Sequence, residues 1–264
     1  HIHNKEIVSI GDPDLRFEED PVRSLRAIRF CTKLNFKINN NIKEAIYKKG
    51  HLLSSVSNAR LFDEFCKIFL NGMAEKNFNK LISFGLNKYL VSTNLNGCEF
   101  SNQLIIEALR NTDNRVKNNQ SVTPGFLIAA LLWPQLIKKS LKDNEINLKK
   151  FFRSMDSILR NQQKITAIPR KFHTYIKDIW VLQLKLHSRI GRQPYKTLKH
   201  PRFRAAYDFL LVREKASAKT KDLGNWWTKF QKNNEDLKKK LINDLKKNNI
   251  EEHSKIFGFS EELR

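Results

Sequence analysis

Glycine, proline and cysteine are all scarce in this sequence, and each scarcity excludes something. The 264 residues include only nine glycines and seven prolines, which disfavours a fold rich in β-turns and favours helices. The three cysteines, Cys31, Cys66 and Cys98, are odd in number, widely spaced and set among apolar residues. They form neither a zinc motif nor a disulfide framework, so we expect a reducing, cytoplasmic location.

Long apolar stretches are missing too. No run approaches the roughly 18–20 residues of a membrane span, and no signal peptide is visible. We therefore expect no membrane partner. The chain begins with His1 and not with Met, so we expect it to be a fragment of a longer protein.

The familiar motifs of catalysis are also absent. The sequence contains no Gly-x-Ser-x-Gly, no P-loop and no Cys-x-x-Cys, and its histidines are scattered; we expect His173, His187 and His200 to be surface or capping residues. Asp12-Pro13-Asp14 has the Asp-x-Asp form of magnesium-binding phosphoryl-transfer enzymes. Proline separates its carboxylates and no Gly-Ser stretch precedes them, so we predict a turn. The chain therefore offers no catalytic residues and no metal ligands of its own.

Positive charge is what the sequence has in excess. Its formal net charge is +22 and its isoelectric point is about 10.0, which indicates a polyanionic partner, most simply nucleic acid. Lysines outnumber arginines 33 to 16. Some of the lysines can therefore be neutral substitutions on solvent-exposed faces, and the arginines are the better indicators of a binding site.

Hydrophobic periodicity predicts an all-α array of helices with one short strand at residues 5–11. Apolar and aromatic residues at helical spacing indicate where the helices run, and glycines indicate where some of them end. We expect helices at about 20–35, 40–49, 58–71, 75–84, 86–92, 101–113, 124–138, 145–164, 169–190, from 200 onward, 223–230 and 235–248. Pro134 should kink or shorten the helix that contains it, and the last helix should be exposed.

The most unusual stretch is 19–30. Asp20 followed by Pro21 predicts a helix start, with an acidic N-cap and proline at the first helical position. Beyond it, arginines and apolar residues each recur every three residues and form parallel stripes along the helix: Arg23, Arg26 and Arg29, beside Val22, Leu25 and Ile28. A carboxylate acceptor next to a guanidinium donor can read the edge of a nucleobase. The alternative is an N-cap with a local ion pair.

A second basic segment interleaves cations with aromatic residues. It comprises Arg189, Arg192, Tyr195, Lys196, Lys199, Arg202, Phe203 and Arg204. The cations could neutralise RNA phosphates while Tyr195 or Phe203 stacks on bases; the alternative is a solvated basic face over core aromatics. Arg60 and Glu64 have the spacing of a helix-surface salt bridge, and Trp226 and Trp227 should be core residues.

Several of these residues occur in strings that resemble a known family. The strings are Arg16 to Phe30, Lys33 to Phe36 and Ala59 to Glu64. They resemble the helical neck of the bacterial poly(A) polymerase and CCA-adding enzyme superfamily, in which a helical body follows a small nucleotidyltransferase head. The resemblance implies that Asp20 and Arg23, with Glu19 and Arg26, bind the nucleotide base. It implies that Arg16, Arg29, Arg60 and Glu64 brace this motif.

The second half resembles the poly(A) polymerase branch specifically. The matching strings are Asn111 to Val116, Asp178 to Leu184, His200 to Leu210, and Trp226-Trp227 with Phe230. By this resemblance the chain is the neck and body of a polynucleotide adenylyltransferase that adds AMP from ATP to RNA 3′ ends. It would bind RNA through Arg189, Arg192, Lys196, Arg202 and Arg204.

The resemblance also implies parts that this sequence does not contain. Magnesium would be held by carboxylates of a head upstream, so the chain alone should be inactive. We expect residues 1–13 to be the last head strand and link, 14–95 the neck, 96–168 the body, 169–232 the RNA-binding part and 233–264 a charged tail. RNA-decay or RNA-chaperone proteins would be further partners. The alternatives are a CCA-adding enzyme and a headless RNA-binding or interaction protein.

Overall fold

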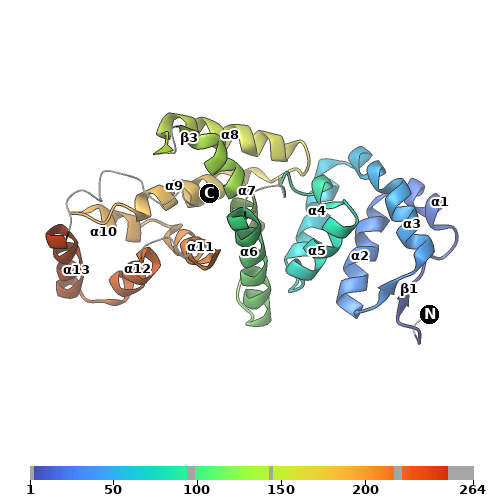
Figure 1. Ribbon diagram of the computed structural model, residues 1–264, viewed down its shortest axis with the longest axis horizontal. Coiled ribbons are helices and arrows are strands. Elements are labelled where there is room, and N and C mark those ends of the chain that lie inside the picture. Colours follow the sequence, from blue (N-terminus) through green and yellow to red (C-terminus); the bar gives the residue numbers. More distant parts are fainter. Residues whose placement is uncertain (1–2, 94–98, 143–144, 217–221, 249–264) are drawn as a thin grey trace. The chain divides into compact units, whose positions relative to one another are not determined.

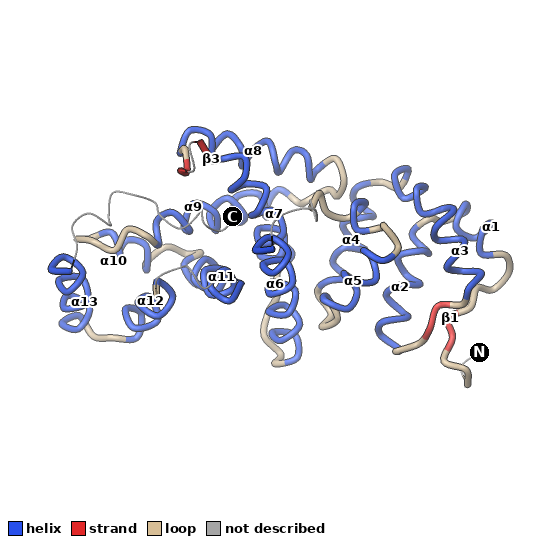
Figure 2. Tube along the Cα trace, in the orientation of Figure 1, coloured by secondary structure: helices blue, strands red, loops and turns tan. Residues whose placement is uncertain are grey.

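The computed structural model describes residues 3–93, 99–142, 145–216 and 222–248, and helices make up most of them (Figures 1 and 2). The expected all-α fold class is confirmed. The chain divides into two compact units: unit 1 contains His1–Thr93, Leu109–Pro124 and Leu159–Pro169, and unit 2 contains Asn94–Ala108, Gly125–Ile158 and Arg170–Arg264. The finer division into five parts stays a prediction.

Unit 1 holds the first helices of the chain. Its elements are β1 (Glu6–Ile7), α1 (Pro13–Glu19), α2 (Val22–Leu34), β2 (Lys37–Ile38), α3 (Asn40–Lys49), the 3₁₀ helix η1 (Gly50–Ser55), α4 (Asn58–Phe69), α5 (Ala74–Ser83) and the 3₁₀ helix η2 (Asn87–Tyr89). Helix α2 packs against α1, α4 and α5, and α1 packs against α3. The apolar stripe of α2 forms the centre of this packing, because Val22, Leu25 and Ile28 are fully buried.

Later elements follow in the order α6 (Glu99–Lys117), α7 (Pro124–Ser140), β3 (Leu141–Lys142), β4 (Glu145–Ile146), α8 (Leu148–Gln163), α9 (Arg170–Leu186), α10 (Gln193–Leu198), α11 (Phe203–Ala216), α12 (Leu223–Lys232) and α13 (Glu235–Asn248). Helices α6 and α8 each carry residues of both units.

No helix among the described residues is long and apolar enough to cross a membrane. Cys31 and Cys66 are free thiols, whereas Cys98 and the tail beyond residue 248 lie outside the described part.

The turn predicted at Asp12-Pro13-Asp14 is wrong, because helix α1 starts there. The Asp12 carboxylate accepts a hydrogen bond from the Asp14 N–H at 3.0 Å, and Pro13 takes the first helical position. This is the same cap-and-proline signature that predicts the next helix. That next helix, α2, is assigned from Val22, and the Asp20 carboxylate accepts from the Val22 N–H at 3.2 Å, as the capping interpretation requires.

The strand predicted over residues 5–11 is present but only two residues long. β1 pairs in parallel with β2, so that Glu6 faces Lys37 and Ile7 faces Ile38. A second two-residue pair, β3 with β4, is antiparallel and is absent from the sequence-based expectations. Such short pairs give too little periodicity to be seen in a sequence.

One helix prediction also fails: residues 86–92, predicted as a helix, contain only the 3₁₀ helix η2. Pro134 does not shorten its helix, since α7 continues to Ser140, and a kink at Pro134 stays a prediction. A proline inside a helix costs about 3 kcal/mol, but α7 is buried on almost every side, including Trp133, Leu136 and Ile137. Burial of these side chains offsets that cost.

The C-terminal helices of unit 2 pack around aromatic residues. Trp226 and Trp227 belong to this core, as expected, and the Trp227 indole N–H donates to the Leu186 carbonyl oxygen at 2.8 Å. Helix α13 is less exposed than predicted, because Ile242 is buried in the same core. Arg213 is also buried; it donates to the Gln183 side-chain oxygen at 3.0 Å and lies over the Trp133 ring.

His187, expected at the surface or in a cap, lies instead in a desolvated position at the end of α9. Burial lowers its pKa to about 3, and the positive charges of Arg213 and Arg189 contribute to this shift. By contrast, His200 does act as a cap: its Nδ1 accepts from the Arg202 N–H at 3.1 Å.

The desolvation of His187 makes the stability of the chain depend on pH. Below the unfolded pKa of about 6.5 the unfolded chain binds a proton that folded His187 does not, so unfolding becomes easier as the pH falls. We expect this group to lower the free energy of unfolding by about 2 kcal/mol between pH 7 and pH 5, measured by urea denaturation. The variant His187→Gln should lose this part of the slope, whereas His51→Gln should keep it. Identical slopes in both variants would contradict the assignment.

Candidate functional site

Asp20 lies between α1 and α2 and makes hydrogen bonds to both helices. Its backbone N–H donates to the Arg16 carbonyl oxygen at 3.1 Å and closes α1, while its Oδ1 caps the start of α2 at Val22. Proline at 21 leaves the chain no freedom to continue α1 straight into α2. The carboxylate is thus held in one position at the corner between two helices, with its side chain 16% exposed.

Three guanidinium groups surround the second oxygen of this carboxylate. Arg60 Nη2, from α4, donates to Asp20 Oδ2 at 2.8 Å. Arg26 Nη1 lies 3.8 Å and Arg23 Nε 3.9 Å from the same oxygen. The predicted salt bridge between Arg60 and Glu64 does not form among these described residues, because Arg60 turns to Asp20 instead.

Glu19 and Arg16 extend the cluster along α1. Arg16 Nη1 donates to Glu19 Oε2 at 3.0 Å, and Arg16 Nε donates to the Ile10 carbonyl oxygen at 3.1 Å. Glu19 Oε2 also lies 3.7 Å from Arg23 Nη2. Arg29 does not join the cluster: its guanidinium lies over the Phe30 ring, 4.8 Å from the centroid. The arginine stripe of α2 therefore divides after Arg26.

Glu64 supports the cluster from α4. Its side chain is 2% exposed, and its Oε1 lies 3.0 Å from Lys67 Nζ and 3.7 Å from Arg26 Nε. A buried carboxylate is costly unless it is paired, so these two cations stabilise it, and it in turn positions Arg26. Lys67 is not among the residues predicted from the sequence, although its i,i+3 spacing from Glu64 is a signal for such a pair.

This geometry can present a donor and an acceptor to a planar ligand. Arg23 approaches Asp20 and Glu19 only at 3.7–3.9 Å, beyond the usual hydrogen-bond range, and its side chain is 40% exposed. Its N–H groups are therefore available to a ligand. Asp20 retains acceptor capacity, because a carboxylate has about four lone-pair sites.

The described residues do not fit a magnesium site. Asp12 uses its carboxylate to cap α1, and Asp14 pairs with Lys48. No group of three or more His, Cys, Asp or Glu side chains in the described ranges is placed to hold a metal ion. The sequence resemblance assigns magnesium to a head upstream, and this part of the chain provides no alternative ligands.

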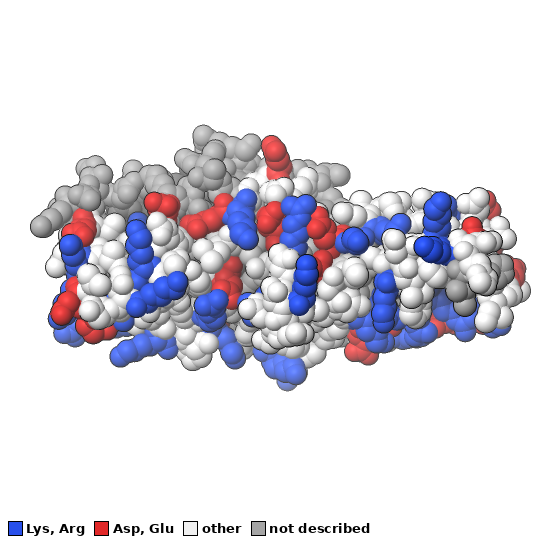
Figure 3. Space-filling view, turned by 90° about the horizontal axis from the view of Figure 1, so that it is seen from below, with Lys and Arg blue, Asp and Glu red and all other residues white. Residues whose placement is uncertain are grey.

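The second basic segment follows α9 in unit 2. Arg192 and Lys196 are exposed, and so are Arg202 and Arg204. Two of these four have partners in the chain, since Arg202 lies over the Tyr175 ring and Arg204 pairs with Asp208 at 3.1 Å. On the face shown in Figure 3, basic side chains are the more frequent, with acidic ones among them.

The aromatic residues of this segment do not face outward as the stacking interpretation requires. Phe203 is only 6% exposed and packs against Tyr207 and Trp227. Tyr195 packs edge-on against Phe230, with ring centroids 5.3 Å apart. The prediction of base stacking is therefore wrong for Phe203, and Tyr195 is a partly buried core residue. Phosphate contact by the cations stays a prediction.

Models of two protein families match this sequence. "Polymerase A arginine-rich C-terminus" matches residues 144–255, and "Probable RNA and SrmB-binding site of polymerase A" matches residues 35–93. The first match covers most of the described helices of unit 2, including the basic segment. The second covers β2 to η2 of unit 1.

Curated proteins that match this chain include poly(A) polymerases, in agreement with the two family models. Poly(A) polymerase I of Salmonella typhi is 36% identical over 247 residues, which is 89% of this chain and 53% of the relative. Poly(A) polymerase I of Haemophilus influenzae is 36% identical over 245 residues, 89% of this chain and 54% of the relative. The CCA-adding enzyme of Bacillus pumilus is more distant, 27% identical over 83% of this chain and 56% of the relative. The chain thus spans about half the length of these relatives.

One solved structure confirms the fold. A chain described as a tRNA-processing enzyme aligns with a TM-score of 0.59 and 17% sequence identity, over 92% of this chain and 65% of that chain. At this identity the similarity shows the fold alone.

The different contacts of Asp20 can be compared by double-mutant cycles. We expect the pair Asp20→Asn and Arg60→Gln to show a coupling of about 1 kcal/mol in the free energy of unfolding at low salt, because Arg60 is the one guanidinium at hydrogen-bond distance from Asp20. The matched pair Asp20→Asn and Arg23→Gln should show a smaller coupling. Equal couplings would contradict this arrangement. Urea denaturation of the single and double variants supplies the measurement.

Proposed function

Because this chain belongs to the bacterial poly(A) polymerase family, we propose that it supplies adenine recognition and RNA binding for the addition of AMP from ATP to RNA 3′ ends. The observation that carries the proposal is the Asp20 and Arg23 pair, held at the α1–α2 corner by Arg60. The 36% identity to poly(A) polymerases, against 27% to a CCA-adding enzyme, favours adenylation over CCA addition.

The geometry supports recognition of one base edge. Adenine offers an amino donor at N6 and a ring acceptor at N1 on the same edge. Asp20 would accept from the amino group while Arg23 donates to the ring nitrogen. Cytosine presents a similar donor and acceptor, so this pair alone does not distinguish the two bases. The position of the pair, fixed by Arg60 and Arg26, would decide which base fits.

The chemistry itself would take place on another part of the protein. The RNA 3′ hydroxyl attacks the α-phosphate of ATP and pyrophosphate leaves, and the magnesium ions that the family uses would stabilise the charge that develops. This chain's residues would hold the base and the RNA. Arg189, Arg192, Lys196, Arg202 and Arg204 are the proposed RNA contacts in unit 2.

A partner protein and a cellular location are also proposed for this activity. The description of one matching family names a protein, SrmB, beside RNA, so we propose an RNA-decay or RNA-chaperone protein as a partner. The free thiols of Cys31 and Cys66 support a cytoplasmic location.

The first test separates nucleotide choice from RNA binding. The chain is joined to the part of Haemophilus influenzae poly(A) polymerase I that it does not cover, and incorporation of ATP and CTP on an RNA primer is measured. Arg23→Ala should lower kcat/KM for ATP about 10- to 100-fold, the loss expected for one hydrogen bond from a charged donor, with RNA affinity almost unchanged. Arg160→Ala, an exposed arginine of α8, is the matched control.

Other outcomes of this experiment would redirect the proposal. Equal losses of RNA affinity and kcat/KM in Arg23→Ala would exclude base reading. Preferential CTP incorporation by the unchanged chimera would favour a CCA-adding enzyme.

The chain by itself should not extend RNA. Incubated with ATP, magnesium and a radiolabelled RNA primer, the 264-residue chain is expected to give no product above background. Product formation at a rate comparable to the chimera would show that catalysis does not need the part that the chimera adds.

A further inference from the structure

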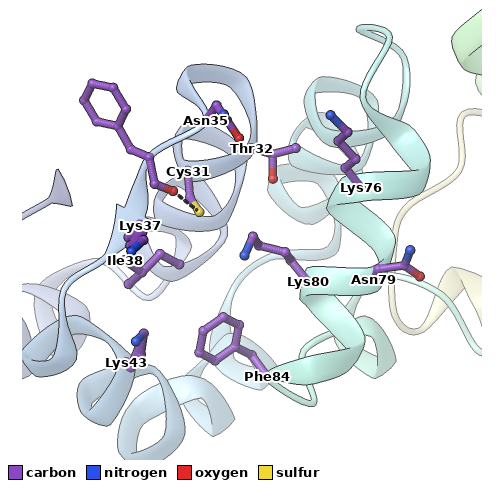
Figure 4. Close-up of a pocket in the computed structure, with 11 residues that line it drawn as sticks. Cys31, Thr32, Asn35, Lys37, Ile38, Lys43, Lys76, Asn79, Lys80 and Phe84 are labelled. Atoms are coloured by element: carbon purple, nitrogen blue, oxygen red, sulfur yellow. Dashed lines mark hydrogen bonds between the residues drawn. The ribbon is translucent and has the colours of Figure 1, made fainter. Parts of the chain in front are cut away.

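A cavity of about 640 Å³ lies in unit 1 between α2, β2, α3 and α5 (Figure 4). It is lined by four lysines, called here the cavity lysines: Lys37, Lys43, Lys76 and Lys80. Figure 4 shows Lys37 and Lys43 on one side of the hollow and Lys80, extending from α5, on the other. The cavity volume falls in the range of about 300–1,000 Å³ that is usual for small-molecule sites.

The cavity lysines differ from other lysines of the same unit. Lys48, Lys49 and Lys67 each pair with a carboxylate. Among the described residues, no Asp or Glu lines the cavity and none lies within ion-pair distance of the cavity lysines; Lys43 Nζ donates to the Asn40 side-chain oxygen at 3.1 Å instead. Their positive charge is therefore left to solvent or to an anionic ligand.

The wall that α2 contributes does not supply the missing negative charge. Burial raises the pKa of the Cys31 thiol, although Lys80 and Lys43 act in the opposite direction, so the thiol stays protonated at pH 7. The Thr32 hydroxyl donates to the Ile28 carbonyl oxygen at 3.0 Å. Neither group can neutralise four ammonium charges.

The rest of the lining is suited to a nucleoside. Phe84 provides an aromatic ring, which the Tyr47 ring supports with centroids 5.3 Å apart. Asn35 and Asn79 provide amides, which both donate and accept hydrogen bonds as the edge of a base requires. One hollow thus combines cations for phosphates, a ring for stacking and amides for polar edges.

A free nucleotide fits this arrangement better than a strand of RNA does. A single strand is bound along a groove that continues past each nucleotide, whereas the cavity lysines lie around one hollow. Cys31 and Thr32, which form part of its wall, also lie outside the segment 35–93 that the matching family model describes for RNA and SrmB. The ligand class is therefore a separate question from RNA binding by that segment.

The cavity is also separate from the Asp20 and Arg23 pair. Thr32 follows Arg23 by nine residues on α2, which is two and a half helical turns and about 13 Å along the axis. The two side chains consequently leave the helix in opposite directions. A base held by Arg23 does not lie in the cavity.

We propose that this cavity binds a free nucleoside 5′-polyphosphate, with the phosphates on the cavity lysines and the base against Phe84. The inference goes beyond the proposed function, because it adds a second nucleotide site to the chain. It does not depend on adenine recognition at Asp20 and Arg23.

The charge of the ligand is tested first, by titration calorimetry of the 264-residue chain in magnesium-free buffer. Affinity should rise at least about threefold from AMP to ADP and again to ATP, because each phosphate adds charge-assisted hydrogen bonds. Lys43→Gln/Lys80→Gln should weaken ATP binding at least about 10-fold. The matched control Lys88→Gln/Lys117→Gln, two exposed lysines of unit 1 outside the cavity, should stay within about twofold. Equal losses in the two variants would overturn the proposal.

The contribution of the base is tested with inorganic triphosphate. It should bind about 10-fold more weakly than ATP, the loss expected when stacking on one aromatic ring is missing. Phe84→Leu should remove most of this difference, whereas Phe30→Leu, at an exposed aromatic residue outside the cavity, should preserve it. If the unchanged chain binds triphosphate as tightly as ATP, the assignment to a nucleotide is wrong.

A measurement without substitutions locates the ligand and does not depend on the folding of any variant. The lysines are acetylated with a water-soluble ester in the presence of ATP, and the products are followed by mass spectrometry. ATP should protect the cavity lysines several-fold over Lys88. Uniform protection would refute the site, and so would stronger protection by a 15-nucleotide RNA at the same phosphate concentration, which would assign these lysines to RNA.

The variant Arg23→Ala separates this inference from the proposed function. It should bind ATP within about twofold of the unchanged chain, since the two sites are distinct. Loss of ATP binding in Arg23→Ala, with none in the cavity variant, would place the nucleotide at Asp20, so that the cavity proposal fails and adenine recognition stands. If the chain binds no ATP, the cavity proposal fails, and the chimera still decides the proposed function.

Discussion

The carboxylate of Asp20 is the contact on which the arrangement of unit 1 depends. It caps α2 through the Val22 N–H, while the backbone of the same residue closes α1, and Arg60 reaches it from α4. One residue thus connects three helices. Its net contribution to stability is modest, since exposed or half-exposed ion pairs contribute about 0.2–1 kcal/mol. Its effect on position is larger, because it determines where the arginines of α2 can lie.

Capping and the proposed recognition are compatible because a carboxylate has about four lone-pair sites. Asp20 Oδ1 caps α2 and Oδ2 accepts from Arg60, which leaves acceptor capacity on both oxygens. Arg26 lies beside the buried Glu64. Arg23 is the guanidinium with loose contacts on both sides. A site that fixes most of its groups and leaves one donor free binds with little loss of side-chain entropy.

Local signals in the sequence predict much of this fold and part of the site. Helix α2, its apolar stripe and the cap at Asp20 follow from spacing within a few residues, whereas Asp12-Pro13 is compatible with a turn as well as with the start of α1. The Asp20–Arg60 contact joins residues 40 positions apart, and i,i+4 spacing wrongly pairs Arg60 with Glu64. Burial of Phe203 depends on α11 packing against α12.

The position of Asp20 between two helices has a consequence for substitutions at this corner. A residue without a side-chain acceptor at position 20 would remove the cap of α2 together with the negative charge beside Arg23. The start of the helix and the charge of the cluster therefore change together at this position. At position 23 the guanidinium can change while both helix ends keep their caps, so the two properties are separable only there.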